Sequence, residues 1–241
     1  MSWKDCLVVI PTYNEVETIY EVVDRVVGDG FAVLIVDDNS PDGTGELADQ
    51  LDSSYGARVD VWHRPEKQGL GKAYLAGFSW ALRWSPYAYI GQMDADLSHP
   101  PERLKDLYTI AQLPGVDLAL GSRYKPGGGL DQGWSPLRRA LSRWANTYAR
   151  LLLRTDISDW TGAFKVWTRP LLKAVLDRKP RGKGYCSQIE MTYLAVQEGA
   201  AVVEVPFYFK DREKGQSKMS WAITAEAAAR VLAMGLLPRR N

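Results

Sequence analysis

The chain has 241 residues, of which 46% are apolar and 24% charged, and its formal net charge is +1. This composition is ordinary for a globular protein, and the length fits one large domain or two small ones. The near-neutral charge excludes a surface that binds polyanions throughout, so no nucleic-acid partner is expected, and two cysteines are too few for a disulfide scaffold and fit a reducing cytosol.

The first half of the chain alternates strand-like and helix-like segments. Apolar residues form short uninterrupted runs in some segments and recur at helical spacing in others. The expected strands are 7–10, 32–36, 59–62 and 87–93, and the expected helices are 15–27, 43–51 and 71–84. Repeated βα units of this kind predict a mostly parallel sheet that is covered by helices on both faces.

Acidic residues follow two of these strands. Asp37 and Asp38 end the second strand, and Asp94 and Asp96 follow the fourth. Open α/β sheets bind ligands at the carboxyl ends of their strands. Residues i and i+2 of an extended segment face the same side, so Asp94 and Asp96 can bind one cation, for which Mg²⁺ or Mn²⁺ suits the oxygen ligands. From these patterns alone, a solvated pair of loop acids and an ordinary turn over 38–43 stay open as alternatives.

Neither of the common glycine-rich phosphate-binding motifs follows the first strand. Residues 11–15, Pro-Thr-Tyr-Asn-Glu, stand in that place, which disfavours a dinucleotide-dependent dehydrogenase and a P-loop enzyme. Segment 67–72 contains two lysines and two glycines and fits either an approach to a diphosphate or a plain loop and helix start. The sequence therefore favours a nucleotide site that is built from acids and loop backbone.

The second half contains a glycine-rich segment and a strongly amphipathic helix. Residues 125–129, Lys-Pro-Gly-Gly-Gly, are expected to form a mobile loop and no regular structure. Over 134–154, apolar residues share one face of the expected helix and four arginines gather on the other. The other expected elements are strands at 116–121 and 201–209, helices at 170–176 and 187–197, and an alanine-rich helix near the C-terminus.

The amphipathic helix over 134–154 has two readings. It can dock on an anionic membrane, where each basic residue is worth about 1 kcal/mol, or it can pack its apolar face on the sheet. No run of 18 uncharged apolar residues occurs, so no transmembrane helix is expected, and no signal peptide precedes the first apolar run.

Seven segments in one order resemble the signatures of a known family. They are VIPTYNE (9–15), VDDNSPDGT (36–44), GLGKAY (69–74), MDADLSHPP (93–101), GSRY (121–124), GYCSQIEM (184–191) and DREKGQSKM (211–219). They look like those of the polyprenol (dolichol) phosphate mannose synthases, which are family 2 glycosyltransferases of the GT-A fold. The resemblance implies a single GT-A domain over 1–241, with a mostly parallel central sheet flanked by helices and with C-terminal amphipathic helices. It also implies a nucleotide-binding part at about 1–122 and an acceptor- and membrane-facing part at about 123–241.

The activity that the resemblance implies is a metal-dependent glycosyl transfer. Mannose would pass from GDP-mannose to a polyprenyl (dolichyl) phosphate with inversion, giving polyprenyl β-mannosyl phosphate, with Mg²⁺ or Mn²⁺ as the cofactor. Two alternatives stay open, namely a polyprenyl-phosphate glucosyltransferase that uses UDP-glucose and a non-catalytic nucleotide-sugar- or membrane-binding module. The expected location is the cytoplasm, in peripheral contact with the cytoplasmic face of a membrane, either directly or through a membrane-embedded partner.

The family's roles carry over position by position. The implied catalytic residues are Asp94, Asp96, Arg123 and Arg212. The implied donor-nucleotide-binding residues are Pro11, Tyr13, Glu15, Val36, Asp38, Lys67, Asp94, Ala95, Asp96, Arg212 and Lys218. The acceptor phosphate would meet Arg123 with Arg138 or Arg139, and the metal would take Asp94, Asp96 and, weakly or through water, Ser98, where some relatives carry Gln.

Two further segments and one acidic residue complete the sequence-based expectations. Residues 211–219 hold three cations and are expected to close over the bound donor as a lid. Segment 159–165, Asp-Trp-Thr-Gly-Ala-Phe-Lys, departs from the family's more usual Asp-x-Thr-Ser-Gly-Phe-Arg. Glu190 is expected to be a helix-face acid that a nearby arginine satisfies.

Overall fold

The computed structural model describes residues 4–182, 184–211 and 221–236. The strands are β1 (Cys6–Thr12), β2 (Ala32–Asp37), β3 (Val59–His63), β4 (Tyr89–Gln92), β5 (Leu118–Ser122), β6 (Gly129–Leu130), β7 (Lys165–Thr168), β8 (Val202–Pro206) and β9 (Tyr208–Phe209). The α-helices are α1 (Ile19–Gly28), α2 (Thr44–Tyr55), α3 (Leu70–Trp84), α4 (Leu104–Ala111), α5 (Pro136–Leu153), α6 (Arg169–Asp177), α7 (Gly184–Gln197) and α8 (Trp221–Leu236), and Gly56–Arg58 and Pro101–Arg103 form short 3₁₀ turns.

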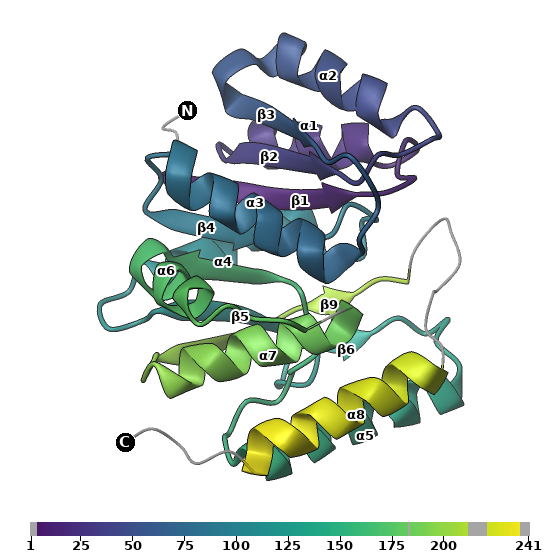
Figure 1. Ribbon diagram of the computed structural model, residues 1–241, viewed down its shortest axis with the longest axis vertical. Helices are drawn as coiled ribbons and strands as arrows, with labels where there is room; N and C mark the ends of the chain where they lie inside the picture. The colour runs from purple at the N-terminus through teal and green to yellow at the C-terminus, as the bar shows by residue number, and fades with distance from the viewer. Residues whose placement is uncertain (1–3, 183, 212–220, 237–241) are drawn as a thin grey trace.

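Seven strands form one sheet in the order β3-β2-β1-β4-β7-β5-β8, and a separate ribbon pairs β6 with β9 (Figure 1). All described neighbours in the large sheet run parallel except the two pairs that include β7. The expectation of a mostly parallel central sheet flanked by helices is therefore confirmed. Strands from both sides of residue 122 share this sheet.

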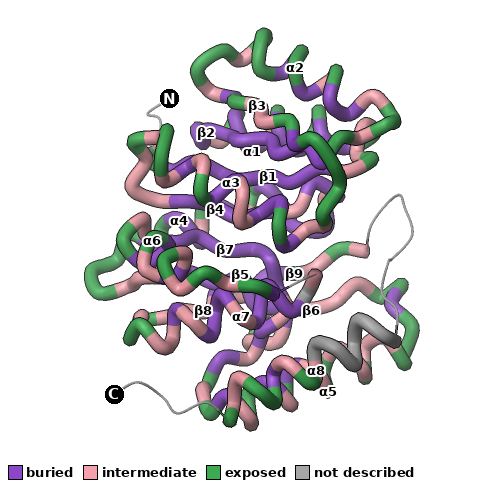
Figure 2. The backbone as a smooth tube through the Cα atoms, viewed as in Figure 1, coloured by how far each residue is buried: buried purple, intermediate pink, exposed green. Residues whose placement is uncertain are grey.

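Helices cover both faces of the sheet, as the sequence of β1 requires. Its residues Cys6, Val8 and Ile10 pack into a core with α1, α2 and α4. Leu7 and Val9 point the other way, into a core with α3, α6 and α7. A strand that is buried on both faces must be apolar at every position, and Figure 2 shows the central strands as the buried interior of the molecule.

Strand β7 was not expected from the sequence. It has only four residues, Lys-Val-Trp-Thr, and inserts antiparallel between β4 and β5. Neither its length nor its lysine marks it as the centre of a sheet. Its position between β4 and β5 follows from the three-dimensional structure and not from its own sequence.

The expected mobile loop at 125–129 was partly wrong. Gly129 belongs to β6, which pairs in parallel with β9. A Cβ added at Gly128 would lie 2.5 Å from the carbonyl oxygen of Ser122, so the backbones pack too closely for any other residue. The glycines here permit a tight approach of two chain segments.

Two other boundaries also differ from the expectations. The strand expected at 201–209 is divided, because β8 ends at Pro206 and β9 begins at Tyr208. The first helix begins at Ile19, four residues later than expected, because the carbonyl of Glu15 accepts hydrogen bonds from the amides of Thr18 and Ile19 in a preceding turn.

Helix α5 packs chiefly against α8, and the two lie side by side at the end of the molecule opposite β3 (Figure 1). The buried residues of α5 are Asn146, Ala149 and Leu153. The large apolar residues at seven-residue spacing face solvent instead, with exposed fractions of 68% for Leu137, 51% for Trp144 and 71% for Leu151. The reading in which this apolar face packs on the sheet is therefore wrong for these three residues, whereas Tyr148 and Leu152 pack against a core cluster that includes Leu120 of β5.

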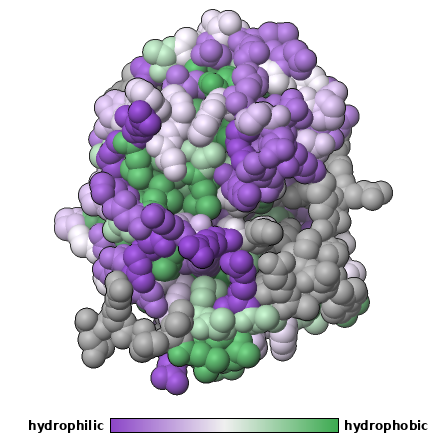
Figure 3. Space-filling model, viewed as in Figure 1, coloured by the Kyte–Doolittle hydropathy of each residue, from purple (hydrophilic) through white to green (hydrophobic). Residues whose placement is uncertain are grey.

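The surface at this end of the molecule is apolar in part. Leu232 and Leu236 of α8 are also exposed, and Figure 3 shows hydrophobic residues gathered where α5 and α8 lie. Among the described residues, no helix is both long and apolar enough to span a membrane.

Candidate active site

The buried carboxylate of Asp37 links the carboxyl ends of β1 and β2 through hydrogen bonds. Asp37 accepts hydrogen bonds from the hydroxyl of Thr12 at 2.9 Å and from the hydroxyl and amide of Ser40 at 2.6 and 3.0 Å. The Ser40 hydroxyl in turn accepts from the amide of Asn14 at 3.1 Å. Asp37 therefore fixes the turn that follows β2 against the loop that follows β1.

Asp38 is also buried and holds a different loop. It accepts a short hydrogen bond from the guanidinium of Arg64 and bonds of 3.2 Å from the amides of both Gln68 and Gly69. The residue that the resemblance assigns to the nucleoside thus anchors the segment that runs from β3 into α3.

Several other residues expected at the donor nucleotide lie together at this end of the sheet. Pro11 and Val36 are register partners near the ends of β1 and β2. The ammonium of Lys67 lies 3.5 Å from the ring centre of Tyr13, a close cation–π contact. Glu15 is in the turn before α1. The structure brings these sequence-distant residues to one edge of the sheet.

The Asp94–Asp96 pair follows β4, next to β1, at the point where the strand order reverses direction. Tyr74 donates a hydrogen bond of 2.7 Å to Oδ1 of Asp94. The hydroxyl and amide of Ser98 donate to Oδ1 of Asp96 at 2.6 and 3.1 Å. Nδ1 of His99 accepts from the amide of Asp94 at 3.1 Å. Side chains from α3 and from the loop itself therefore orient both carboxylates.

The protonation states of Tyr74 and His99 fit these bonds. Burial and the neighbouring Asp94 raise the pKa of Tyr74 well above its ordinary value, so the phenol keeps its proton and donates. Burial lowers the pKa of His99, although Asp94 acts against it, so the imidazole is neutral and can accept at Nδ1. The His99 ring is stacked on Phe164 with the ring centres 5.1 Å apart.

The oxygen ligands at this site suit a cation that takes some of its ligands from the protein and others from a substrate. Asp94 and Asp96 supply hard oxygen atoms, whereas no group of three or more His, Cys, Asp or Glu side chains among the described residues is placed to hold a metal ion. Mg²⁺ typically binds to one or two carboxylates, water and substrate phosphates, so the residues present fit such an ion. The proton of the Ser98 hydroxyl is directed at Asp96, and direct binding of Ser98 to metal stays a prediction.

Arg123 is held by a buried carboxylate. Asp159 accepts from Nε of Arg123 at 2.7 Å and from Nη2 at 2.6 Å, and Thr161 also accepts from Nη2 at 2.6 Å. Burial alone would raise the pKa of Asp159, but the adjacent guanidinium outweighs this and lowers it, so the carboxylate stays charged. The segment that departs from the usual family pattern thus supplies the partner of Arg123.

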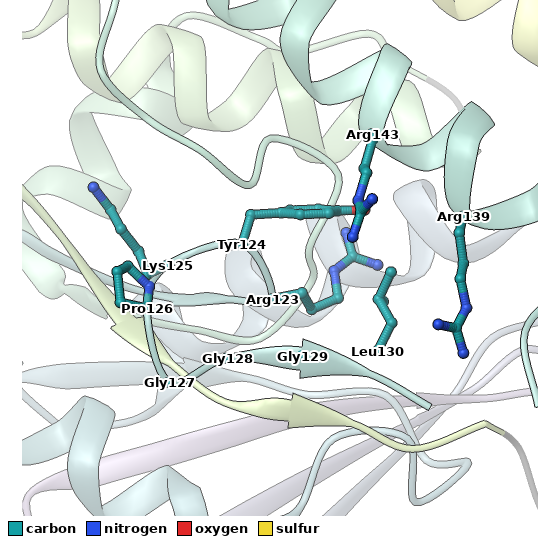
Figure 4. A pocket seen from close by; sticks show the side chains of 10 residues that line it. All are labelled: Arg123, Tyr124, Lys125, Pro126, Gly127, Gly128, Gly129, Leu130, Arg139 and Arg143. Carbon is teal, nitrogen blue, oxygen red and sulfur yellow. The ribbon is translucent and has the colours of Figure 1, made fainter. Parts of the chain in front are cut away.

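A cavity of about 530 Å³ lies between the segment after β5 and helix α5. Its described lining is Arg123, Tyr124, Lys125, Pro126, Gly127, Gly128, Gly129, Leu130, Arg139 and Arg143 (Figure 4). Sequence reasoning did not place Tyr124, Lys125 or Arg143 at this site. The four-residue spacing of Arg139 and Arg143 in a helix puts both on one face and was the available signal.

The structure separates the two candidate partners of Arg123. Arg139 lines the cavity. Arg138 does not line it; its guanidinium pairs with Asp211 at 3.0 Å and lies 3.6 Å from the ring centre of Trp134.

A buried lysine lies behind the site. Nζ of Lys165 donates to the side-chain and backbone oxygens of Gln188 at 3.0 and 3.3 Å. The amide of Gln92 donates to the same side-chain oxygen at 2.6 Å. Burial lowers the pKa of Lys165 to about 7, although Asp159 and Asp94 act in the opposite direction.

Lys165→Met is expected to change the pH dependence of stability. Between pH 7 and 10.5 the unfolded chain binds a proton at Lys165 that the folded protein has lost. Because the unfolded state then binds more protons, wild-type stability should rise with pH across this window relative to the variant, by at most about 1.4 kcal/mol per pH unit. Urea unfolding at pH 7 and 9 measures the difference, with exposed Lys173→Met as the control. If the difference in unfolding free energy between wild type and Lys165→Met does not change with pH, the lowered pKa of Lys165 is contradicted.

Two other expected features have different outcomes. Glu190 accepts hydrogen bonds from the backbone amides of Arg181 and Gly182, so among the described residues its partners are amides and not the expected guanidinium. Arg212, Lys218 and the expected lid after Asp211 lie outside the described residues.

The chain is similar to known proteins along most of its length. A family model described as glycosyl transferase family 2 matches residues 7–176. The polyprenol monophosphomannose synthase of Mycolicibacterium smegmatis is 46% identical over 235 residues, which are 97% of this chain and 88% of that protein. The undecaprenyl-phosphate mannosyltransferase of Micrococcus luteus is 39% identical over 236 residues, which are 97% of this chain and 95% of that protein.

Two solved structures share the fold at low sequence identity. Glucosyl-3-phosphoglycerate synthase from Mycobacterium tuberculosis, in complex with phosphoglyceric acid, has a TM-score of 0.67 at 17% identity, covering 97% of this chain and 80% of that chain. GalNAc-T7 with UDP, GalNAc and Mn²⁺ has a TM-score of 0.61 at 17% identity, covering 95% of this chain and 47% of that chain.

The sheet order and these structural neighbours show the GT-A fold, with the acidic pair at the switch point of the sheet. By the match of the family model and by its relatives, the chain belongs to glycosyl transferase family 2. The expected fold, enzyme class and family are thereby confirmed.

Proposed function

We propose that this enzyme transfers mannose from GDP-mannose to a polyprenyl or dolichyl phosphate with inversion, giving polyprenyl β-mannosyl phosphate. The observation that carries the proposal is the 46% identity over 97% of the chain to a polyprenol monophosphomannose synthase. The second relative is named a mannosyltransferase as well, which favours mannose over the alternative transfer of glucose from UDP-glucose.

The geometry supports a transfer between two neighbouring subsites. Phe209 contacts both of them, because its ring centre is 5.8 Å from that of His99 in the acidic loop and 5.4 Å from the guanidinium carbon of Arg123. The donor nucleotide would bind at the edge formed by Tyr13, Lys67 and the acids. The acceptor phosphate would bind in the cationic cavity.

The proposed reaction requires the protein to position the acceptor phosphate and does not require a strong general base. A phosphate monoester carries a charge near −2 at neutral pH, since its second pKa is about 6, so the attacking oxygen is already ionised. Arginine side chains in the cavity would hold this phosphate and offset repulsion from the donor diphosphate. A Mg²⁺ or Mn²⁺ ion held by Asp94 and Asp96 would supply charge stabilisation to the departing nucleoside diphosphate.

A donor panel tests the proposed function directly. Purified enzyme is incubated with polyprenyl phosphate and either radiolabelled GDP-mannose or UDP-glucose, and lipid product is extracted. Label is expected in lipid only with GDP-mannose, a divalent cation and phosphorylated acceptor. Transfer of glucose would favour the alternative donor, and tight nucleotide binding without transfer would favour the non-catalytic alternative.

We further propose that α5 and α8 contact a membrane surface peripherally. The exposed apolar row of α5 and the exposed leucines of α8 form one part of this surface. Arg143 and Arg150, on the other face of α5, are exposed as well, and basic side chains that reach an anionic leaflet add about 1 kcal/mol each. In this arrangement the acceptor cavity, which α5 lines, would lie next to lipid.

The double substitution Trp144→Ser and Leu151→Ser is expected to weaken binding to anionic phospholipid vesicles by about tenfold or more, because two large apolar side chains can no longer be buried. Co-sedimentation with vesicles measures this. Trp84→Ser is a matched control, because Trp84 is 64% exposed and belongs to α3, which lies apart from α5 (Figure 1). Equal binding by the double variant and wild type would exclude α5 as the contact.

A further inference from the structure

The cavity beside α5 has a strong excess of positive charge. Four of its ten described lining residues are arginine or lysine, and none of those ten is acidic. Figure 4 shows the Arg123 and Arg143 side chains directed into the same space from opposite walls, with Tyr124 between the segments that carry them. Like charges that share a cavity repel one another, so the arrangement favours an anion within it.

Two of the four charges are already offset by carboxylates behind the wall. Arg123 pairs with buried Asp159 at 2.6 Å. The ammonium of Lys125 lies 3.3 Å from Glu204, whose side chain is also buried. Glu204 accepts from the backbone amide of Asp159 as well. These two cations therefore shape the cavity while adding little net charge to it.

The two arginines from α5 have no such compensation. Arg139 donates to the carbonyl oxygens of Trp134 at 3.0 Å and Asp131 at 2.7 Å, which are neutral acceptors that hold its guanidinium in place. Arg143 is exposed and makes no hydrogen bond or ion pair with any described residue. The net charge of the cavity thus comes from Arg139 and Arg143, and Arg143 has all of its donors available.

We infer that Arg143 binds the acceptor phosphate directly, together with Arg139, and that the cavity is matched in charge to a phosphate monoester. This inference rests on the proposed function. Two uncompensated guanidiniums suit a group of charge near −2, and the forked donors of Arg143 can pair bidentately with phosphate oxygens. Tyr124, which lines the cavity and whose hydroxyl lies 2.6 Å from that of Ser142, adds a neutral hydrogen-bonding group.

Arg150 provides a matched control for Arg143. It lies seven residues further along α5, and therefore on the same helix face, but it pairs with Asp156 at 3.1 Å and does not line the cavity. Arg143→Ala and Arg150→Ala remove the same charge from the same side of the helix. Any loss of general attraction to anionic lipid affects both, whereas loss of a phosphate ligand affects only Arg143→Ala.

The test uses the full chain in detergent micelles with a short-chain isoprenyl phosphate as the acceptor. Arg143→Ala is expected to raise the KM for this acceptor by about tenfold or more, as loss of a charge-assisted bond predicts, with the KM for GDP-mannose unchanged. Arg143→Lys should recover part of the loss, because it restores charge without the fork. Calorimetric titration with the isoprenyl phosphate, with inorganic phosphate and with the unphosphorylated isoprenol measures binding without turnover.

The outcomes separate this inference from the proposed function. If wild type transfers mannose but Arg143→Ala and Arg150→Ala have equal acceptor KM values, the inference is overturned and the proposed function stands. If wild type transfers nothing, yet binds isoprenyl phosphate about tenfold more tightly than Arg143→Ala does, the site is supported and the proposed reaction is wrong. Tighter binding of isoprenol than of isoprenyl phosphate would also overturn the assignment to phosphate.

Discussion

Asp96→Asn is expected to lower kcat for mannosyl transfer by about 10²–10³ or more while the protein stays folded, since the charge that forms on the departing diphosphate would lose its stabilisation. The substitution keeps the shape of the side chain, and an amide oxygen can still accept from the Ser98 hydroxyl and amide that now bind Oδ1 of Asp96. Circular dichroism and radiolabel transfer at several Mg²⁺ concentrations together measure the effect. Asp106→Asn, which removes a partly exposed acid paired with Arg103, is the control for loss of one negative charge.

Two further measurements bear on the metal assignment. Excess chelator should abolish wild-type transfer, and added Mg²⁺ or Mn²⁺ should restore it. The variant should need more cation than wild type to reach its own maximal rate. Full wild-type turnover in excess chelator would contradict a role for Asp94 and Asp96 in binding a cation.

Arg123→Ala is expected to have a large effect on both stability and transfer. The substitution leaves Asp159, which is 0% exposed, without its guanidinium partner. Breaking a buried pair from one side typically costs about 3–5 kcal/mol of unfolding free energy. Transfer to lipid phosphate should also fall more than donor binding does, because Arg123 lines the acceptor cavity. Urea unfolding, acceptor kinetics and GDP titration measure the three quantities.

The double variant Arg123→Ala, Asp159→Ala separates the two effects. It removes the unpaired buried carboxylate, so its stability should recover relative to Arg123→Ala alone. Transfer should stay low, because the guanidinium is still missing. Recovery of transfer together with stability would show that Arg123 only supports the fold, and weaker GDP binding with unchanged acceptor kinetics would place it at the donor.

The sequence was most informative where a pattern is local and repeated. The apolar runs of β1 and β2 must be buried on both faces, so they predict a parallel sheet without knowledge of their neighbours. The placement of Asp94 and Asp96 after β4 follows from the same rule, because ligands bind at carboxyl ends of strands. Helix α5 was also expected from its periodicity.

The sequence was least informative where a residue's role depends on a distant partner. Asp159 and Arg123 are 36 residues apart, and no local pattern indicates that they pair. The sequence pattern of the apolar face of α5 is the same whether the face contacts a sheet or solvent. Only the packing with α8 in the structure distinguishes the two interpretations. The sequence showed Arg143 only as one of four arginines on a helix face, because its cavity is formed with the chain that follows β5.

The antiparallel strand β7 has a consequence for the order in which the chain can fold. Because β7 lies between β4 and β5, the two parts of the sheet cannot be joined until residues 165–168 have left the ribosome. A fragment of residues 1–122 would contain both neighbours of β7 but not β7, leaving unpaired edges on β4 and β5, and such edges favour aggregation. Despite its nucleotide-site residues, the first half of this enzyme is therefore expected to depend on later sequence for its solubility during synthesis.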